Sequence, residues 1–133
     1  MPTTFEKLNL KLQTEILVLN APASFEPELN QLSGVHVHRS LGKLKRIDFS
    51  LVFATTKTEV DALSPKIARL AAGDAIVWFA YPKGTSKRYK CGFNRDNGWD
   101  VLSSLGFETV RAVAIDEDWS ALRFRRSEFV KSR

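Results

Sequence analysis

Asp74-Ala75-Ile76-Val77-Trp78-Phe79-Ala80-Tyr81 is the stretch of this sequence that decides its fold. An unbroken apolar run follows Asp74 and ends at Pro82. The run is far shorter than the ~20 residues that a membrane-spanning helix needs. It is also rich in β-branched and aromatic side chains, which favour strands. The pattern is typical of a strand that is buried on both faces, as in a parallel sheet.

Similar strand patterns occur on both sides of this run. The segment 15–19 is almost continuously apolar, and 35–38 alternates strictly between apolar and polar residues. An alternating segment of that kind is typical of a strand that is covered on one face only. The expected strands are, in chain order, 15–19, 35–38, 48–54, 74–81, 108–115 and 120–124.

Helical segments alternate with these strands, which predicts an α/β fold with a three-layer, Rossmann-like sheet of six strands. The expected helices are 24–32, one capped by Thr56 or Thr58 and ended by Gly73, and one capped by Asn94 or Asp96 and ended by Gly106. Right-handed crossovers limit the topology, and we expect the strand order 2-1-3-4-6-5. The last strand should be antiparallel, because only a short hairpin precedes it.

Composition sets the broad class of the protein. The 133 residues are 44% hydrophobic and 26% charged, which fits one globular domain over residues 1–133. The one cysteine, Cys91, excludes an internal disulfide framework. The N-terminus has no apolar signal core, so we expect a cytoplasmic protein with no membrane association.

Three segments carry a family resemblance that spans roughly residues 8 to 126. They are Val18-Leu19-Asn20-Ala21-Pro22, Tyr81-Pro82-Lys83-Gly84-Thr85-Ser86-Lys87 and Trp119-Ser120-Ala121-Leu122-Arg123-Phe124. They resemble a family of small bacterial proteins of unknown function, which is regarded as a degenerate class I methyltransferase-like domain. The resemblance implies a Rossmann-like fold whose final antiparallel strand lies inside the sheet. It implies no particular activity.

The cofactor features of methyltransferases are missing from this sequence. These enzymes have a glycine-rich turn after the first strand, where backbone approaches S-adenosylmethionine closely. Here the turn is Asn20-Ala21-Pro22, and His38-Arg39 stands where an acidic residue would bind the ribose hydroxyls. We therefore expect no cofactor and no catalytic residues. The alternative is an S-adenosylmethionine-dependent methyltransferase with an atypical cofactor turn at Asn20, Ala21 and Pro22.

Basic residues are concentrated in three stretches, although the net charge is only +5. The stretches are Arg39, Lys43, Lys45 and Arg46; Lys83, Lys87, Arg88, Lys90 and Arg95; and Arg123, Arg125, Arg126, Lys131 and Arg133. Such clusters attract phosphates, nucleic acids or acidic protein surfaces. We expect the first two stretches at the ligand-binding edge of the sheet and the third at the opposite edge. One continuous nucleic-acid track is therefore not expected, and nonspecific nucleic-acid binding stays an alternative.

The loop 82–95 is the best candidate site, because it follows the carboxyl end of a central strand, where open α/β sheets bind ligands. Lys83, Gly84, Thr85, Ser86 and Lys87 would form an anion cradle, with Arg88 and Arg39 as outer charges. The sequence thus predicts a non-catalytic domain that binds a phosphate-containing small molecule or an acidic protein. The acidic turn 116–118 should lie at the same edge and could pair with the lysines.

Two histidines are the remaining candidates for chemistry. His36 and His38 should point the same way from one strand, as two metal ligands would, but no third ligand follows at motif spacing. We therefore expect no metal. An uncovered strand face there could instead serve self-association.

Overall fold

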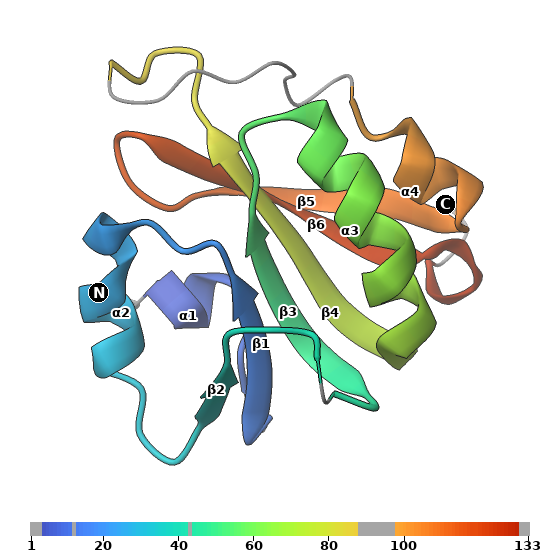
Figure 1. Cartoon of the computed structure of the whole chain (residues 1–133), viewed down its shortest axis with the longest axis horizontal. Coiled ribbons are helices and arrows are strands. Elements are labelled where there is room, and N and C mark those ends of the chain that lie inside the picture. The colour runs from blue at the N-terminus through green and yellow to red at the C-terminus, as the bar shows by residue number, and fades with distance from the viewer. Residues whose placement is uncertain (1–3, 12, 43, 88–97, 131–133) are drawn as a thin grey trace.

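The computed structural model describes residues 4–11, 13–42, 44–87 and 98–130. These residues form a twisted sheet with helices packed against it (Figure 1). The strands are β1 (Glu15–Leu19), β2 (His36–His38), β3 (Ile47–Phe53), β4 (Ala71–Pro82), β5 (Phe107–Ala114) and β6 (Trp119–Arg126). The helices are α1 (Thr4–Lys7), α2 (Glu26–Asn30), α3 (Lys57–Leu70) and α4 (Asp100–Ser104), with short 3₁₀ segments at Ala23–Phe25 and Ser127–Phe129.

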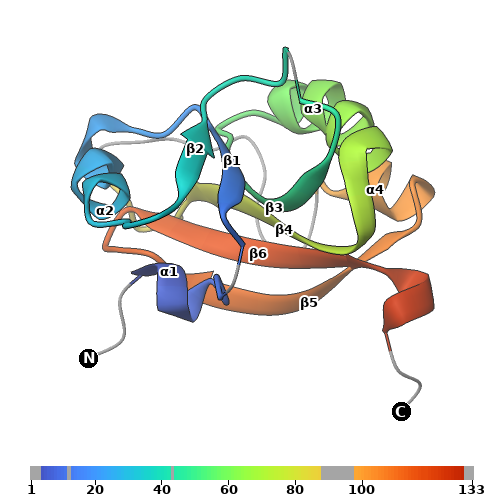
Figure 2. The same cartoon turned by 90° about the horizontal axis from the view of Figure 1, so that it is seen from below.

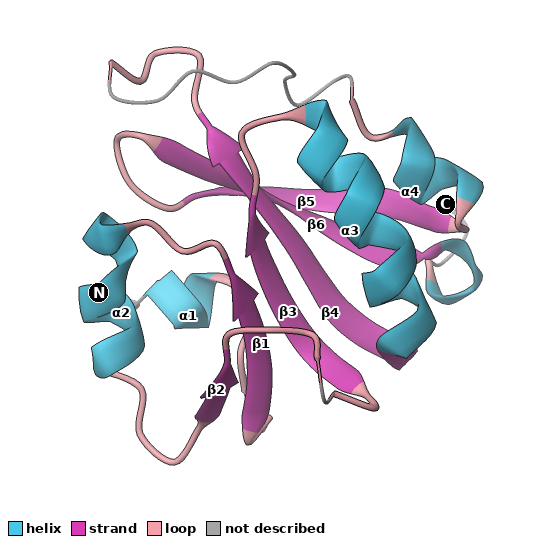
Figure 3. Cartoon of the chain, in the orientation of Figure 1, coloured by secondary structure: helices cyan, strands magenta, loops and turns pink. Residues whose placement is uncertain are grey.

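The strand order is β2-β1-β3-β4-β6-β5, which confirms the order expected from the sequence. The first four strands run parallel, and β6 is antiparallel to both β4 and β5 (Figure 3). Consecutive strands in the parallel part need long connections over a sheet face, whereas a tight turn can join only antiparallel neighbours. The short 115–118 turn therefore makes β6 the antiparallel neighbour of β5, and β6 pairs with β4 on its other side.

Apolar side chains cover both faces of the sheet, which confirms the three-layer architecture. On one face, α3 and α4 pack over a cluster that includes Val52, Val77 and Phe124. On the other face, α1 and α2 pack over a cluster that includes Phe49, Trp78 and Ala121. Figure 2 shows α1 on one side of the sheet and α3 with α4 on the other. Alternate residues of each central strand supply the two clusters, as the pleat requires.

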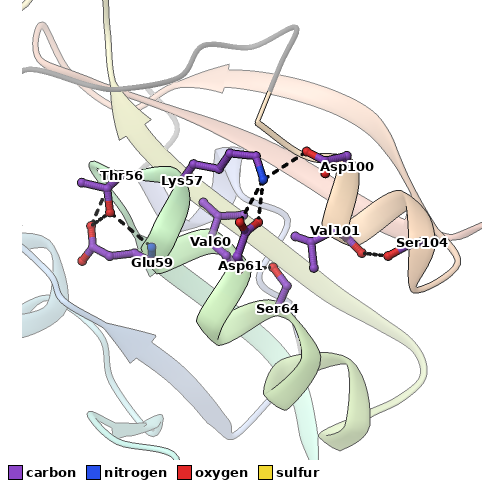
Figure 4. A network of polar contacts seen from close by, with 9 residues as sticks. All are labelled: Thr56, Lys57, Glu59, Val60, Asp61, Ser64, Asp100, Val101 and Ser104. Atoms are coloured by element: carbon purple, nitrogen blue, oxygen red, sulfur yellow. Dashed lines mark hydrogen bonds and ion pairs between the residues drawn. The ribbon is translucent and has the colours of Figure 1, made fainter.

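Thr56 is the N-cap of α3, the first of the two caps that the sequence left open. Its hydroxyl accepts a hydrogen bond from the N–H of Glu59, and the Glu59 carboxylate accepts one from the N–H of Thr56 (Figure 4). Both backbone donors would otherwise lack a partner at the helix start. Lys57 in the next position pairs with Asp61 and reaches Asp100 at the start of α4. This network fixes where α3 begins and joins it to α4.

The expected end of the helix at Gly73 is wrong, and the expected caps Asn94 and Asp96 lie outside the described residues. Helix α3 ends at Leu70, and Gly73 lies inside β4, where its φ of +51° accommodates an irregular pairing with β3. The guanidinium of Arg126 donates to the carbonyls of Ala68 and Ala71, so a distant arginine satisfies the end of α3 in place of a glycine turn. Helix α4 begins at Asp100 with Trp99 at its N-cap.

The connection 39–46 replaces the helix that normally lies between such strands. It passes over the face of β1 on its way from β2 to β3 (Figure 1), and its Leu41 and Leu44 pack against the core. This shortened crossover leaves β2 as a strand of three residues at the edge of the sheet. Across the described residues, no helix is both long and apolar enough to span a membrane.

Candidate functional site

The loop that follows β4 is tied to the turn between β5 and β6. The N–H of Lys83 donates to the carbonyl of Asp118 at 2.8 Å, and the hydroxyl of Ser86 donates to the Asp118 carboxylate at 2.9 Å. The N–H of Ser86 also donates to the carbonyl of Lys83, at 3.0 Å, which closes a tight turn. Three hydrogen bonds therefore hold the backbone of residues 83–86 in one conformation at the carboxyl edge of the sheet.

Asp116 orders the other side of this site. One of its carboxylate oxygens accepts hydrogen bonds from the N–H groups of Asp118 and Trp119, each at 2.8 Å. An aspartate that caps its own turn in this way gives the turn a defined shape. The Asp116 carboxylate is thus engaged by backbone, while Glu117 is exposed.

A cleft of about 440 Å³ lies between the loop and the turn, lined by Thr85, Lys87, Glu117 and Asp118. A Cβ atom on Gly84 would meet no atom of the described residues within 4 Å, so those residues leave space beside this part of the loop. The cleft carries an ammonium group on one wall and two carboxylates on the other. It can therefore hold a ligand that presents both an anionic group and a hydrogen-bond donor or cation.

The structure brings five of the predicted ligand residues together, in the loop Lys83, Gly84, Thr85, Ser86 and Lys87. Arg88 lies outside the described residues. Arg39 follows β2, and the sheet order puts both β1 and β3 between that strand and β4. Ser86 contacts the acidic turn through its hydroxyl, and the lysine-rich pattern did not predict this contact.

Arg39 forms a two-pronged ion pair with Glu26 at the start of α2. The N–O distances are 2.9 and 2.8 Å. Hydrogen bonding to Arg39 holds the pKa of the Glu26 carboxyl below its ordinary value, and the same bonds raise the pKa of Arg39. This arrangement neutralises the charge of the arginine.

In the alternative cofactor turn, Asn20 to Pro22, one residue has the positive φ that is usual for glycine, although the turn contains no glycine. Asn20 has a φ of 60°, in the left-handed region, which asparagine tolerates better than most residues. Its side-chain amide donates to the carbonyl of Phe53 at 3.3 Å, so it links the carboxyl ends of β1 and β3. Pro22 accepts a hydrogen bond from Phe25 as the chain turns into α2, and Ala21 is half-buried between them. None of these three residues lines either pocket described here.

A second pocket, of about 330 Å³, lies beneath the shortened crossover. Its walls include Glu15, His38, Leu44, Arg46 and Asp48. This pocket was not predicted from the sequence, although the short 39–47 connection was a visible signal for it. Strands β1 and β3 pair only from Leu17 onward, so their amino ends diverge and leave the space.

The two histidines do point the same way, as expected. The rings of His36 and His38 lie 4.4 Å apart, and His38 Nε2 contacts a Glu15 carboxylate oxygen at 2.8 Å. Within the described ranges, no group of three or more His, Cys, Asp or Glu side chains is placed to hold a metal ion. Of the two, His38 forms part of the wall of the second pocket.

The basic stretches divide between the two edges of the sheet. Arg46 immediately precedes β3 and pairs with Asp48 at 2.9 Å, so the 39–46 stretch spans both edges and the expectation of one edge is wrong. Arg125 pairs with Asp74 before the apolar part of β4, so this member of the third stretch lies at the opposite edge from the loop, as expected. Lys131 and Arg133 lie outside the described residues. A single basic track does not form from these residues.

No protein-family model and no curated protein matches the chain. Solved structures do match. An S-adenosylmethionine-dependent methyltransferase from Aquifex aeolicus superposes with a TM-score of 0.62 at 13% identity, covering 91% of this chain and 86% of that one. Magnesium protoporphyrin IX methyltransferase from Synechocystis PCC 6803, solved with bound S-adenosylmethionine, gives 0.59 at 14% identity, covering 93% and 74%. The fibrillarin pre-rRNA processing protein from Methanococcus jannaschii gives 0.56 at 9% identity, covering 87% and 67%. The chain therefore has the class I methyltransferase fold, in a Rossmann-like domain whose final strand runs antiparallel.

Proposed function

We propose that this domain binds a small ligand, without transforming it, in the cleft between the 83–87 loop and the 116–118 turn. The proposal rests on the hydrogen bonds from Lys83 and Ser86 to Asp118, because these bonds order the loop in the absence of a ligand. A loop that is already ordered loses little conformational freedom on binding. The site also lies at the edge where sheets of this kind take their ligands.

The charges of the cleft refine the kind of ligand. Lys87 in the cleft wall, with Lys83 in the same loop, suits a phosphate or carboxylate. Glu117 and Asp118 would repel a ligand that carries only negative charge. A small molecule with an anionic group and an amine satisfies both walls, so the proposed class is a zwitterion with a phosphate or carboxylate group.

Calorimetric titration tests this proposal directly. O-phosphoserine carries both charges and should bind more tightly than glycerol phosphate, which lacks the amine. Lys83→Ala with Lys87→Ala should weaken O-phosphoserine binding by about tenfold or more, because charge-assisted hydrogen bonds contribute about 1.5–3 kcal/mol. The matched control is Lys66→Ala with Arg69→Ala, which removes the same charge from exposed positions on α3. Equal affinity in both double variants would reject the cleft as the binding site.

A second function, S-adenosylmethionine-dependent methyl transfer, is supported by the backbone of Asn20. Its positive φ reproduces the conformation that a glycine-rich cofactor turn requires, within the fold of known methyltransferases. Thermal unfolding with and without S-adenosylmethionine tests this function. At 100 times its dissociation constant, the ligand would stabilise the folded protein by about 2.7 kcal/mol. Asn20→Gly would then retain or improve the response, because glycine opens the turn. No shift in the melting temperature of either protein rules this second function out.

A further inference from the structure

The α1 face of the sheet carries an arginine pair that the proposed ligand cleft does not use. Arg123 lies on β6 directly opposite Arg111 of β5, so the two side chains leave the same face side by side. On its other side Arg123 stands opposite Trp78 of β4, which is fully buried. Helix α1 packs over the other end of this face (Figure 2), where Lys7 bonds to the carbonyl of Ala114.

Part of the Arg123 guanidinium is buried without a partner. Its Nε atom is inaccessible to solvent and makes no hydrogen bond within the described part of the chain. A buried donor left without an acceptor costs about 1–3 kcal/mol, and more when the group is charged. The described part of the chain therefore supplies no acceptor for this nitrogen.

The neighbouring charges do not compensate for this pair. Arg125 donates two hydrogen bonds to the Asp74 carboxylate, from Nε at 2.8 Å and from Nη2 at 2.6 Å. Arg125 also lies opposite Glu108 in the pairing of β5 with β6. Among the described residues, no carboxylate lies within ion-pairing distance of Arg111 or Arg123. Burial, with the charges of Arg125 and Arg111, lowers the pKa of Arg123, although Asp74 opposes the effect.

We propose that Arg111 and Arg123 form a binding site for a phosphoryl dianion on the α1 face of the sheet. Two guanidinium groups match two negative charges, whereas a single carboxylate would leave one of them uncompensated. The planar guanidinium fork also bonds phosphate oxygens in pairs. This site is independent of the 83–87 cleft, since it lies toward the opposite edge.

The side-chain N–H signal of Arg123 Nε in ¹H–¹⁵N spectra is the direct readout. Inorganic phosphate should shift that signal in a saturable way, and sodium chloride at matched ionic strength should not. Arg111→Ala should weaken phosphate binding by about tenfold or more, the loss expected for one charge-assisted pair of hydrogen bonds. Arg123→Lys keeps the charge but lacks the fork, so it should weaken binding as well.

Two comparisons make the result decisive. Arg69→Ala removes an exposed arginine from the opposite face of the sheet and should leave phosphate binding unchanged. Lys83→Ala with Lys87→Ala should also leave the Arg123 signal responsive, so a failure of the ligand cleft and a failure of this site can be told apart. A phosphate-independent Arg123 signal, or equal shifts with chloride, would overturn the proposal.

The source of the phosphoryl group is resolved by a second probe. A short peptide with one phosphoserine, compared with its unphosphorylated form, tests a phosphorylated protein segment. Tighter binding of the phosphopeptide than of inorganic phosphate assigns the site to such a segment. Weaker binding of the phosphopeptide assigns it to a small phosphate ester or free phosphate. Loss of both responses in Arg111→Ala is required in either case.

Discussion

The indole Nε1 of Trp78 donates a hydrogen bond to the backbone carbonyl of Leu8 at 2.8 Å. Both residues are fully buried, and 70 positions separate them in the chain. Trp78 lies at the centre of the strand that decides the fold, while Leu8 follows the short helix α1. This bond therefore fastens the N-terminal segment to the middle of the sheet.

Trp78→Phe should detach that segment. The change leaves the Leu8 carbonyl buried without a donor, which costs about 1–3 kcal/mol in the free energy of unfolding. Urea unfolding measures the loss. Amide exchange of residues 8–10 should become faster than in the wild-type protein, while amide exchange of β3 should change less. The control Phe49→Leu alters a buried ring on the same face without removing a hydrogen bond. Unchanged protection at residues 8–10 in Trp78→Phe would contradict this role.

Thr56→Ala should lower the free energy of unfolding by about 1 kcal/mol, because it removes the hydroxyl that caps α3. Thr58→Ala changes an exposed threonine in the first turn of the same helix and should have an effect within about 0.5 kcal/mol. Thermal melting of the two variants makes the comparison. If Thr58→Ala is the more harmful change, the capping assignment is wrong.

Glu26 should titrate below the ordinary value of 4.5, because Arg39 donates two hydrogen bonds to its carboxylate. A carboxyl whose pKa is lowered by folding stabilises the protein above its unfolded pKa, and that contribution is lost as the pH falls through the folded pKa. Carbon NMR titration of the Glu26 carboxyl measures the shift. In Arg39→Gln the pKa should return to the ordinary range, and a pKa that stays low would assign the shift to another group.

Pro65→Ala should stabilise the protein. Pro65 is exposed in the interior of α3, where it has no N–H to offer to the carbonyl of Asp61. Alanine restores that helical bond, and the gain in the free energy of unfolding should be about 1–3 kcal/mol. Lys66→Ala, at the next exposed position, serves as the control in chemical denaturation. A lower midpoint for Pro65→Ala than for wild type would show that the proline is favourable where it stands.

The sheet could be predicted from the sequence because strands that are buried on both faces appear in the sequence as continuous apolar runs. Each central strand must present apolar side chains on alternate positions toward both layers, so 15–19 and 74–81 are recognisable without any partner. The shortness of the 115–118 turn then fixes the direction of β6. These signals are local, and the structure follows them.

The site and the helix ends depend on partners that are distant in sequence. Arg126 satisfies the end of α3 across more than 50 positions, so no nearby glycine marks the end of the helix. Arg39 meets Glu26, and Ser86 meets Asp118, only after the chain has folded. Composition indicates that these residues are charged or polar, but it cannot state which of them neutralise one another.

The two rims of the sheet differ in length, and this limits how copies of the molecule can join. Strand β2 offers three residues, too few to template another strand, whereas β5 offers eight. Sheet-to-sheet contact between copies must then use β5 on both sides. A contact of this kind would close as a two-fold pair, with no second long edge left from which a chain of copies could grow.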